Sequence, residues 1–216
     1  EKDYLDIFKY KNDGTKKEAI QYALLPSQGV LAAYADWPLI QNNASGLKKK
    51  IKGNPDDIKS MVKLAGLYLQ EARVTGNYRY YDAAAMKLVQ HIIKKDPNNF
   101  EALAFKATIF LSQHHFADGL KVAEALQKSF PYNAFVYGIL VDANVEIGDY
   151  DKAVDMADKM ISIRPDLRSY SRISYLREIH GDNNGAIEAM KMAVDAGVAG
   201  DEATEWARIQ LAKLYI

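Results

Sequence analysis

Apolar and polar positions alternate along most of the chain with the spacing of amphipathic helices. One example is the run of Met61, Leu64, Ala65 and Tyr68, whose members lie three or four residues apart and would share one helix face. A longer period lies over this pattern. Three prolines are spaced by 34 residues, and a small residue precedes each by 12: Ala85 and Pro97, Gly119 and Pro131, Ala153 and Pro165. A period of 34 residues is typical of a stacked helix–turn–helix unit.

The clearest copy of this unit lies between residues 137 and 165. Its pattern predicts two helices joined by a turn at Gly148-Asp149-Tyr150, with Pro165 closing the unit. Ala153 is the small residue expected where the two helices touch, because a larger side chain would overfill the crossing. One such pair cannot bury its own apolar face, so we expect neighbouring pairs to stack.

The order of residues in this copy resembles the tetratricopeptide repeat (TPR) family. The shared features are a bulky residue, then Leu with a small residue, Gly-Asp-Tyr at the turn, two alanines and a final Pro, and the resemblance covers about residues 55–216. It implies an all-α protein, a right-handed α-α superhelix of antiparallel helix pairs. The first helix of each pair would line a concave groove.

We expect two regions. Residues 1–53 are predicted to be an N-terminal helical cap or a divergent repeat, and residues 54–216 to hold about four repeats plus a terminal helix. In the first region, Thr15-Lys-Lys-Glu18 has the form of a capping box, with its helix ending at Pro26. A second helix would begin at Ser27 and break at Asp36-Trp37-Pro38.

The first repeat is expected to begin with Asn54 as its N-cap, the residue just before the helix. From Tyr68 to Pro97 this repeat is eight residues longer than the next one, and the extra residues fall between Gln70 and Tyr81. We predict that they lengthen the turn. Exposed Tyr and Arg residues often anchor protein interfaces, so partner contacts are predicted here. The residues are Arg73, Arg79, Tyr80 and Tyr81. The alternative is that the tyrosines pack back over the helix pair.

The resemblance also assigns the groove. Positions of the first helices that face it are predicted to bind a partner: Thr108, Leu111, Ser112, Phe135, Asp142, Glu146, Arg172, Leu176 and His180. One groove position of the repeat is apolar in all four copies, where it is occupied by Leu69, Leu111, Val145 and Ile179. This favours an amphipathic helix or an extended apolar peptide as ligand. The alternatives are that these residues only support the helix wall, or that residues 1–53 fold into the groove.

The amino-acid composition limits the classes of partner that can be expected. Lys+Arg and Asp+Glu number 28 each, so the formal net charge is zero and nucleic acid is not expected as a partner. No apolar run approaches the roughly 20 residues of a membrane-spanning helix, so membrane insertion is not expected. There are no cysteines, which excludes disulfides and thiol chemistry. Because the sequence begins at Glu1, we expect a processed or trimmed soluble protein, either cytoplasmic or exported, for example to a bacterial periplasm.

No residue set predicts catalysis, a cofactor or a metal site. His114 and His115 are adjacent in a turn and cannot share one face of a helix, and no phosphate-binding loop is present. Some family members clamp a partner's terminal carboxylate with Lys and Asn. The corresponding groove positions here are Val62, Gly66, Ala104 and Thr108, none of which is basic or an amide, so this binding mode is not expected. We therefore expect a non-catalytic scaffold that binds a protein or peptide. The alternatives are the helical arm of a larger enzyme and a self-assembly module.

Overall fold

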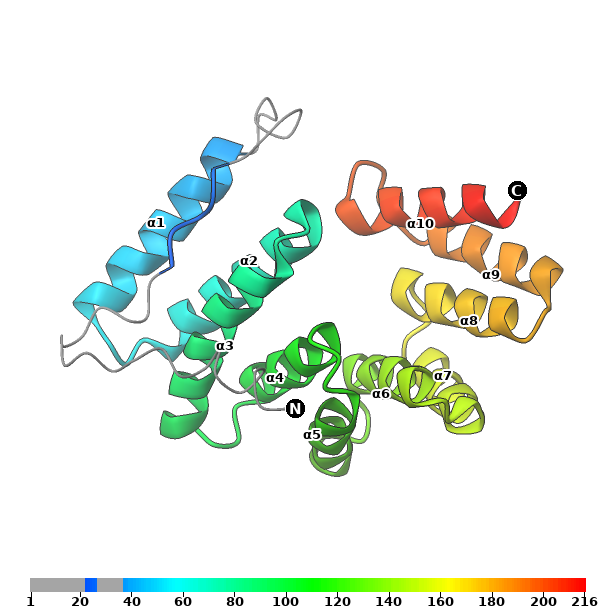
Figure 1. Ribbon diagram of the computed structural model, residues 1–216, viewed down its shortest axis with the longest axis horizontal. Coiled ribbons are helices and arrows are strands. Elements are labelled where there is room, and N and C mark those ends of the chain that lie inside the picture. Colours follow the sequence, from blue (N-terminus) through cyan, green and yellow to red (C-terminus); the bar gives the residue numbers. More distant parts are fainter. Residues whose placement is uncertain (1–21, 27–36) are drawn as a thin grey trace. The chain divides into compact units, whose positions relative to one another are not determined.

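The computed structural model describes residues 22–26 and 37–216, and every regular element in the second range is an α-helix (Figure 1). The prediction of an all-α fold of antiparallel helix pairs is confirmed. The chain divides into two compact units, Glu1–Ile92 and Ile93–Ile216, which are described separately below. The boundary predicted between residues 53 and 54 stays a prediction.

The described part of the first unit holds a five-residue extended segment and three helices. The segment comprises residues 22–26. The helices are α1 (Trp37–Gly53), α2 (Ile58–Thr75) and α3 (Tyr78–Lys95), the last of which ends three residues beyond the unit boundary.

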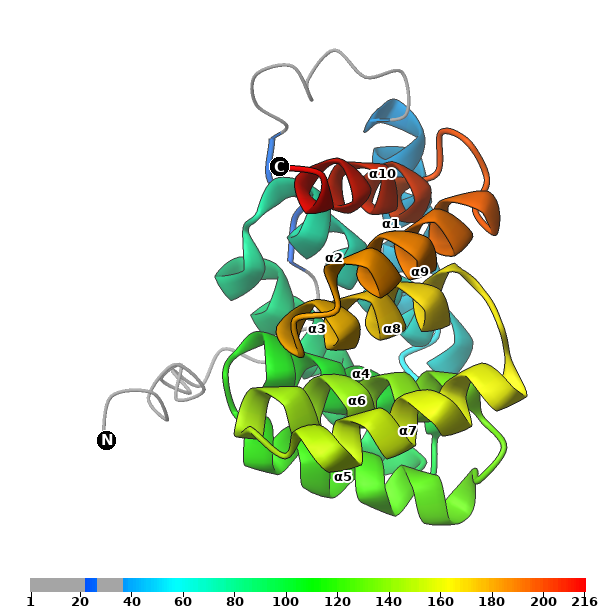
Figure 2. The ribbon, with the colours of Figure 1, turned by 90° about the vertical axis from the view of Figure 1, so that its right-hand side faces the viewer.

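The second unit holds seven helices, three successive pairs and the single final helix α10, and Figure 2 shows α5, α6 and α7 lying side by side. Their bounds are α4 (Phe100–Ser112), α5 (Phe116–Ser129), α6 (Ala134–Ile147), α7 (Tyr150–Ile163), α8 (Leu167–Ile179), α9 (Asn183–Asp195) and α10 (Glu202–Leu214).

Most of these helices begin at an Asn or Asp whose side chain accepts a hydrogen bond from a main-chain N–H of the first turn. This contact satisfies one of the donors that have no partner inside the helix. The residues are Asn99, Asn133, Asp149, Asp166 and Asp182. At the other end, Gly76 and Gly148 stop α2 and α6 with φ of 72° and 83°, a left-handed conformation that side chains with a Cβ resist.

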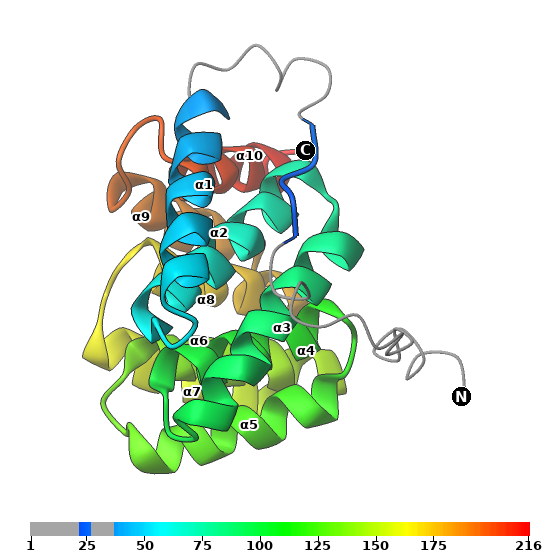
Figure 3. The ribbon, with the colours of Figure 1, turned by 90° about the vertical axis from the view of Figure 1, so that its left-hand side faces the viewer.

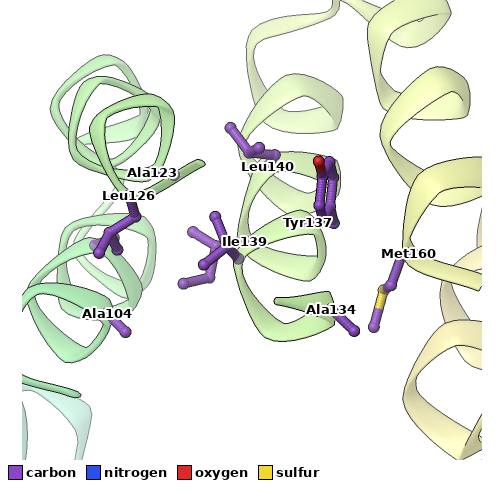
Figure 4. Packing of buried hydrophobic residues seen from close by; sticks show 10 residues of the cluster. Ala104, Ala123, Leu126, Ala134, Tyr137, Ile139, Leu140 and Met160 are labelled. Carbon is purple, nitrogen blue, oxygen red and sulfur yellow. The ribbon is translucent and has the colours of Figure 1, made fainter. Parts of the chain in front are cut away.

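The core of the second unit lies between successive helices. Figure 4 shows Ile139 of α6 pointing toward Leu126 of α5, while Met160 reaches from α7 toward Ala134. The repeated small residues Ala85, Gly119 and Ala153 are all buried, as expected for positions where helices touch. Ala153 is fully buried, in a cluster with Val141, Ala157 and Leu176.

The fourth pair, α8 and α9, has a more polar seam. Ser171 and Ser174 of α8 are buried, and Ser174 Oγ donates a hydrogen bond of 2.7 Å to the carbonyl oxygen of Ala186 in α9. The facing residues of α9 are small, since Ala186 and Ala189 are buried there. This joint therefore relies on a directional contact in addition to apolar packing.

The predicted long turn in the first pair is wrong. The extra residues lengthen both helices, because α2 and α3 have 18 residues each, whereas α4 and α5 have 13 and 14. Only Gly76 and Asn77 separate the two long helices. The sequence before Gly76 is rich in good helix formers such as Gln, Glu, Ala and Arg, so the helix continues until the glycine ends it.

Predictions for the residues before α2 need further correction. Residues 22–26 are extended, whereas a helix was predicted to reach Pro26. α1 begins at Trp37 with Pro38 in its first turn, where a proline removes an N–H that has no helical partner. The break predicted at Asp36-Trp37-Pro38 stays a prediction, because residues 27–36 lie outside the described ranges. The N-cap of α2 is Asp57, one turn after Asn54. The helices predicted from Thr15 and Ser27 lie mainly outside the described residues.

Candidate functional site

The predicted groove positions of the second unit lie on first helices that touch one another, since α4 contacts α6 and α6 contacts α8. Their side chains differ in exposure. Glu146 and His180 are exposed, and Leu176 is buried. The other six are half-buried: Thr108, Leu111, Ser112, Phe135, Asp142 and Arg172. The face thus mixes apolar, neutral polar and charged groups.

An ion pair between Arg172 of α8 and Asp142 of α6 crosses this face. Arg172 Nε donates to Asp142 Oδ1 at 2.8 Å and Nη2 donates to Oδ2 at 2.6 Å, so both carboxylate oxygens are engaged. Arg172 Nε also lies 3.2 Å from the carbonyl oxygen of Gly138. This two-point geometry orients the guanidinium more strictly than a single contact would.

Gly138 makes room for this arginine. A Cβ at residue 138 would lie only 3.2 Å from Arg172 Cζ, so the absent side chain lets the guanidinium lie against α6. Burial by itself lowers the pKa of Arg172, but the paired Asp142 carboxylate outweighs that effect and raises the pKa above its ordinary value. The arginine is therefore a permanent cation of this face.

The apolar residues that recur at one groove position, Leu69, Leu111, Val145 and Ile179, are called the apolar ladder here. They belong partly to the core. Leu111 and Val145 pack against buried clusters, and Leu176 is only 5% exposed. Ile179 is 39% exposed at the end of α8. The next residue, His180, ends α8 and holds its Nδ1 2.7 Å from the carbonyl oxygen of Leu176. The binding role of the ladder and of the nine groove residues stays a prediction.

The residues predicted from the longer repeat separate into two kinds. Arg73 and Arg79 are exposed, near the end of α2 and the start of α3. Tyr81 is fully buried and stacks on Tyr68 with ring centroids 6.0 Å apart, whereas Tyr80 is half-buried and meets the Tyr81 ring edge-on at 5.2 Å. Both tyrosines pack within their own helix pair. Their role toward a partner stays a prediction.

Sequence reasoning missed the segment that these tyrosines hold. Residues 22–26 run alongside α2 and α3 (Figure 3) and are bound there through main-chain atoms. The tyrosines that make these contacts, Tyr68, Tyr80 and Tyr81, are called the tyrosine cluster below. The one sequence signal was Pro26, which biases the residue before it toward an extended conformation.

Burial raises the pKa of the phenol groups in the tyrosine cluster above the ordinary value of 10.0. The folded state then holds these protons more tightly than the unfolded state. The stability linked to them is complete below pH 10.0 and decreases as the pH rises above it.

We therefore expect the urea midpoint of the first unit to fall steeply above about pH 10. Trp37 is the one tryptophan of residues 1–92, so its fluorescence in a Trp206→Phe background reports this unit. A variant with Phe at residues 68, 80 and 81 controls for lysine deprotonation and should show a shallower fall. An equal fall in both proteins would contradict the assignment.

The described residues hold no cluster of three or more His, Cys, Asp or Glu that could bind a metal ion. None of the helices in the described part of the chain is long and apolar enough to cross a bilayer.

Comparison with known proteins gives one significant sequence match and several structural ones. No family model matches the chain. It is 38% identical over 86 residues to the small glutamine-rich tetratricopeptide repeat-containing protein 2 of Saccharomyces cerevisiae (strain ATCC 204508 / S288c). The match covers 39% of this chain and 24% of the yeast protein.

Among solved structures, a thermophilic TPR protein of Thermus thermophilus superposes with a TM-score of 0.67 at 14% identity, over 83% of this chain and 93% of that one. A TPR protein of Parabacteroides merdae ATCC 43184 also superposes with a TM-score of 0.67, at 16% identity. That match covers 84% of this chain and 66% of the other. The 34-residue period, the helix pairs and these matches agree. The chain has the tetratricopeptide-repeat fold.

TPR folds commonly serve as protein-interaction scaffolds. The match spans only about a quarter of the yeast protein, so the identity of that protein's partners does not transfer to this TPR chain. At 14–16% identity the two solved structures establish the fold alone. Any binding site of this TPR protein must be argued from its own residues.

Proposed function

We propose that this TPR protein is a non-catalytic scaffold that binds a protein or peptide along the first helices of its second unit. The ligand lies across α4, α6 and α8, on the face that carries Thr108, Phe135, Asp142 and Arg172. On the lengthened first pair, the exposed Arg73 and Arg79 offer a separate contact to a partner.

The arrangement of Arg172 and Asp142 carries this proposal. Their two-point ion pair joins successive repeats and is still accessible, because the side chains are 26% and 43% exposed. Arg168 lies over the ring of Phe135 at 5.9 Å on the same pair of helices, so a cation and an aromatic ring stand beside the ion pair. Arg and aromatic residues grouped at a partly desolvated site are the usual energetic centre of an interface.

A charge-swapped variant tests this face. In Arg172→Glu, Asp142→Lys the net charge is unchanged and opposite charges still face each other, but the pattern offered to a partner is inverted. We expect partners captured by the wild type to be lost, because like charges then oppose each other across the interface. Affinity capture with quantitative mass spectrometry measures this.

The matched control is Asp158→Lys, Lys159→Glu, which swaps two exposed charges on α7 away from the proposed face. It should retain the wild-type partners. If the groove swap also retains them, while circular dichroism shows both variants folded, the groove is not the binding surface.

A further inference from the structure

The tyrosine cluster binds residues 22–26 mainly through their main chain. Tyr68 Oη donates a hydrogen bond of 2.5 Å to the carbonyl oxygen of Tyr22, and Tyr80 Oη donates one of 2.8 Å to that of Ala23. The N–H of Leu25 donates to Tyr81 Oη at 3.0 Å. These contacts would be satisfied by the backbone of any extended peptide, whatever its side chains.

Lysines of the neighbouring helices complete the site. Lys48 of α1 donates to the same Tyr22 carbonyl oxygen and lies over the Tyr68 ring, 5.9 Å from its centroid. Lys87 of α3 lies 4.8 Å from the centroid of the Tyr22 ring. All of these groups belong to the first unit.

Side-chain preference is confined to a few positions. The Tyr22 ring meets the Tyr80 ring edge-on at 5.1 Å, under the Lys87 ammonium, so this position selects an aromatic residue. Leu24 and Leu25 are half-buried, whereas Ala23 and Pro26 are exposed. The site therefore favours an aromatic residue followed, two and three positions later, by aliphatic ones.

The buried tyrosine hydroxyls of this site need hydrogen-bond partners, which the main chain of an extended segment supplies. Tyr68 and Tyr81 are fully buried, and an unpaired buried hydroxyl destabilises the folded state. The helices leave these hydroxyls facing the segment, so the segment supplies an acceptor to Tyr68 and a donor to Tyr81. Any ligand that replaces residues 22–26 has to restore the same main-chain contacts.

We infer that the tyrosine cluster, with Lys48 and Lys87, is a binding site for an extended peptide of the pattern aromatic-x-aliphatic-aliphatic, and that residues 22–26 fill it as an internal ligand that such a partner displaces. The inference shares Tyr80 and Tyr81 with the predicted partner contacts of the first pair, but it uses none of the groove residues. Because the internal ligand is tethered, its effective concentration is on the order of millimolar, and it suppresses binding of an external peptide.

The test uses a fluorescently labelled peptide, Tyr-Ala-Leu-Leu-Pro with blocked termini, and measures its binding to the full chain by anisotropy. The site is emptied in the variant Tyr22→Gly, Leu24→Ser, Leu25→Ser. We expect the peptide to bind this variant at least about tenfold more tightly than the wild type, because the competing segment no longer occupies the site. A peptide of the same composition in the order Leu-Pro-Ala-Tyr-Leu should bind the emptied variant more weakly, because it keeps the main-chain contacts and loses the aromatic anchor.

A second substitution in the emptied variant, Tyr80→Phe, keeps the ring and removes one main-chain contact. It should weaken peptide binding by about 2- to 10-fold, the effect of one hydrogen bond. The inference is overturned if the peptide does not bind the emptied variant, if it binds wild type and variant equally, or if Tyr80→Phe changes nothing.

If the emptied variant is unfolded by circular dichroism, Tyr22→Ala carries the test. It removes only the aromatic anchor, and it should still bind the peptide more tightly than the wild type does. Equal binding then overturns the inference. The groove swap of Arg172 and Asp142 should bind the peptide as its parent does, so failure of this site and failure of the proposed groove are distinguishable.

Discussion

Replacing Tyr68 with alanine should lower the free energy of unfolding of the first unit by about 3–5 kcal/mol, the range for removing a large buried aromatic side chain. Tyr68 is 0% exposed and stacks on Tyr81, so the substitution leaves a cavity that α1, α2 and α3 cannot close. It also removes the donor to the Tyr22 carbonyl oxygen, which loosens the bound segment.

Urea unfolding followed by Trp37 fluorescence in a Trp206→Phe background measures this loss within residues 1–92. Tyr78→Ala is the matched control, because Tyr78 begins α3 and is 45% exposed. We expect that control to stay within about 0.5 kcal/mol of the parent, as exposed substitutions usually do. Equal losses in the two variants would mean that Tyr68 is not a core residue.

Ala153→Leu should destabilise the second unit by about 1–3 kcal/mol, the cost of forcing extra methylene groups into a packed core. Ala153 is fully buried in α7, in the cluster with Val141 of α6 and Leu176 of α8. A leucine at this crossing either pushes the helices apart or adopts a strained rotamer.

Trp206 fluorescence in a Trp37→Phe background reports unfolding of the second unit. Ala117→Leu makes the same change at an exposed position of α5, so its urea midpoint should stay near that of the parent. An unchanged midpoint for Ala153→Leu would contradict the register in which the repeated small residues mark the helix crossings.

The repeated part of the fold was readable because its signals agree at every level. Asn or Asp begins most helices, Gly148 ends α6, and a small residue stands at each crossing. These features act within one turn or one helix pair, so each copy repeats them at the same place. The period and the turn at Gly148 therefore predicted the helix pairs, whereas the N-cap of the first repeat was misplaced at Asn54.

The conformation of the N-terminal segment was not readable, because contacts distant in sequence determine it. Residues 22–26 contain Ala and two Leu, which favour a helix, and the one local signal for an extended conformation is Pro26, which acts only on the residue before it. Tyr68, Tyr80 and Tyr81 override that preference from 46 to 57 residues away. A tertiary preference of this kind has no period and leaves no trace in the pattern of apolar positions.

The candidate groove was predicted in outline only. The family resemblance placed Asp142 and Arg172 on one face. Their two-point pairing depends in addition on the close approach of Arg172 to Gly138, which has no Cβ. The spacing of apolar residues did not reveal that Leu176 is packed into the core, because core-facing and groove-facing positions neighbour each other around the helix axis.

The serine seam of the fourth pair has a consequence for ligand binding. Arg172 belongs to α8, whose contact with α9 replaces aliphatic volume by the Ser174 hydroxyl and small alanines. The Ser174 hydrogen bond holds α8 against α9, and the Arg172–Asp142 ion pair holds α8 against α6, so directional contacts fix α8 on both sides. A ligand that grips Asp142 and Arg172 together would bind only while α8 is docked, and would thereby protect the C-terminal end of the chain from fraying.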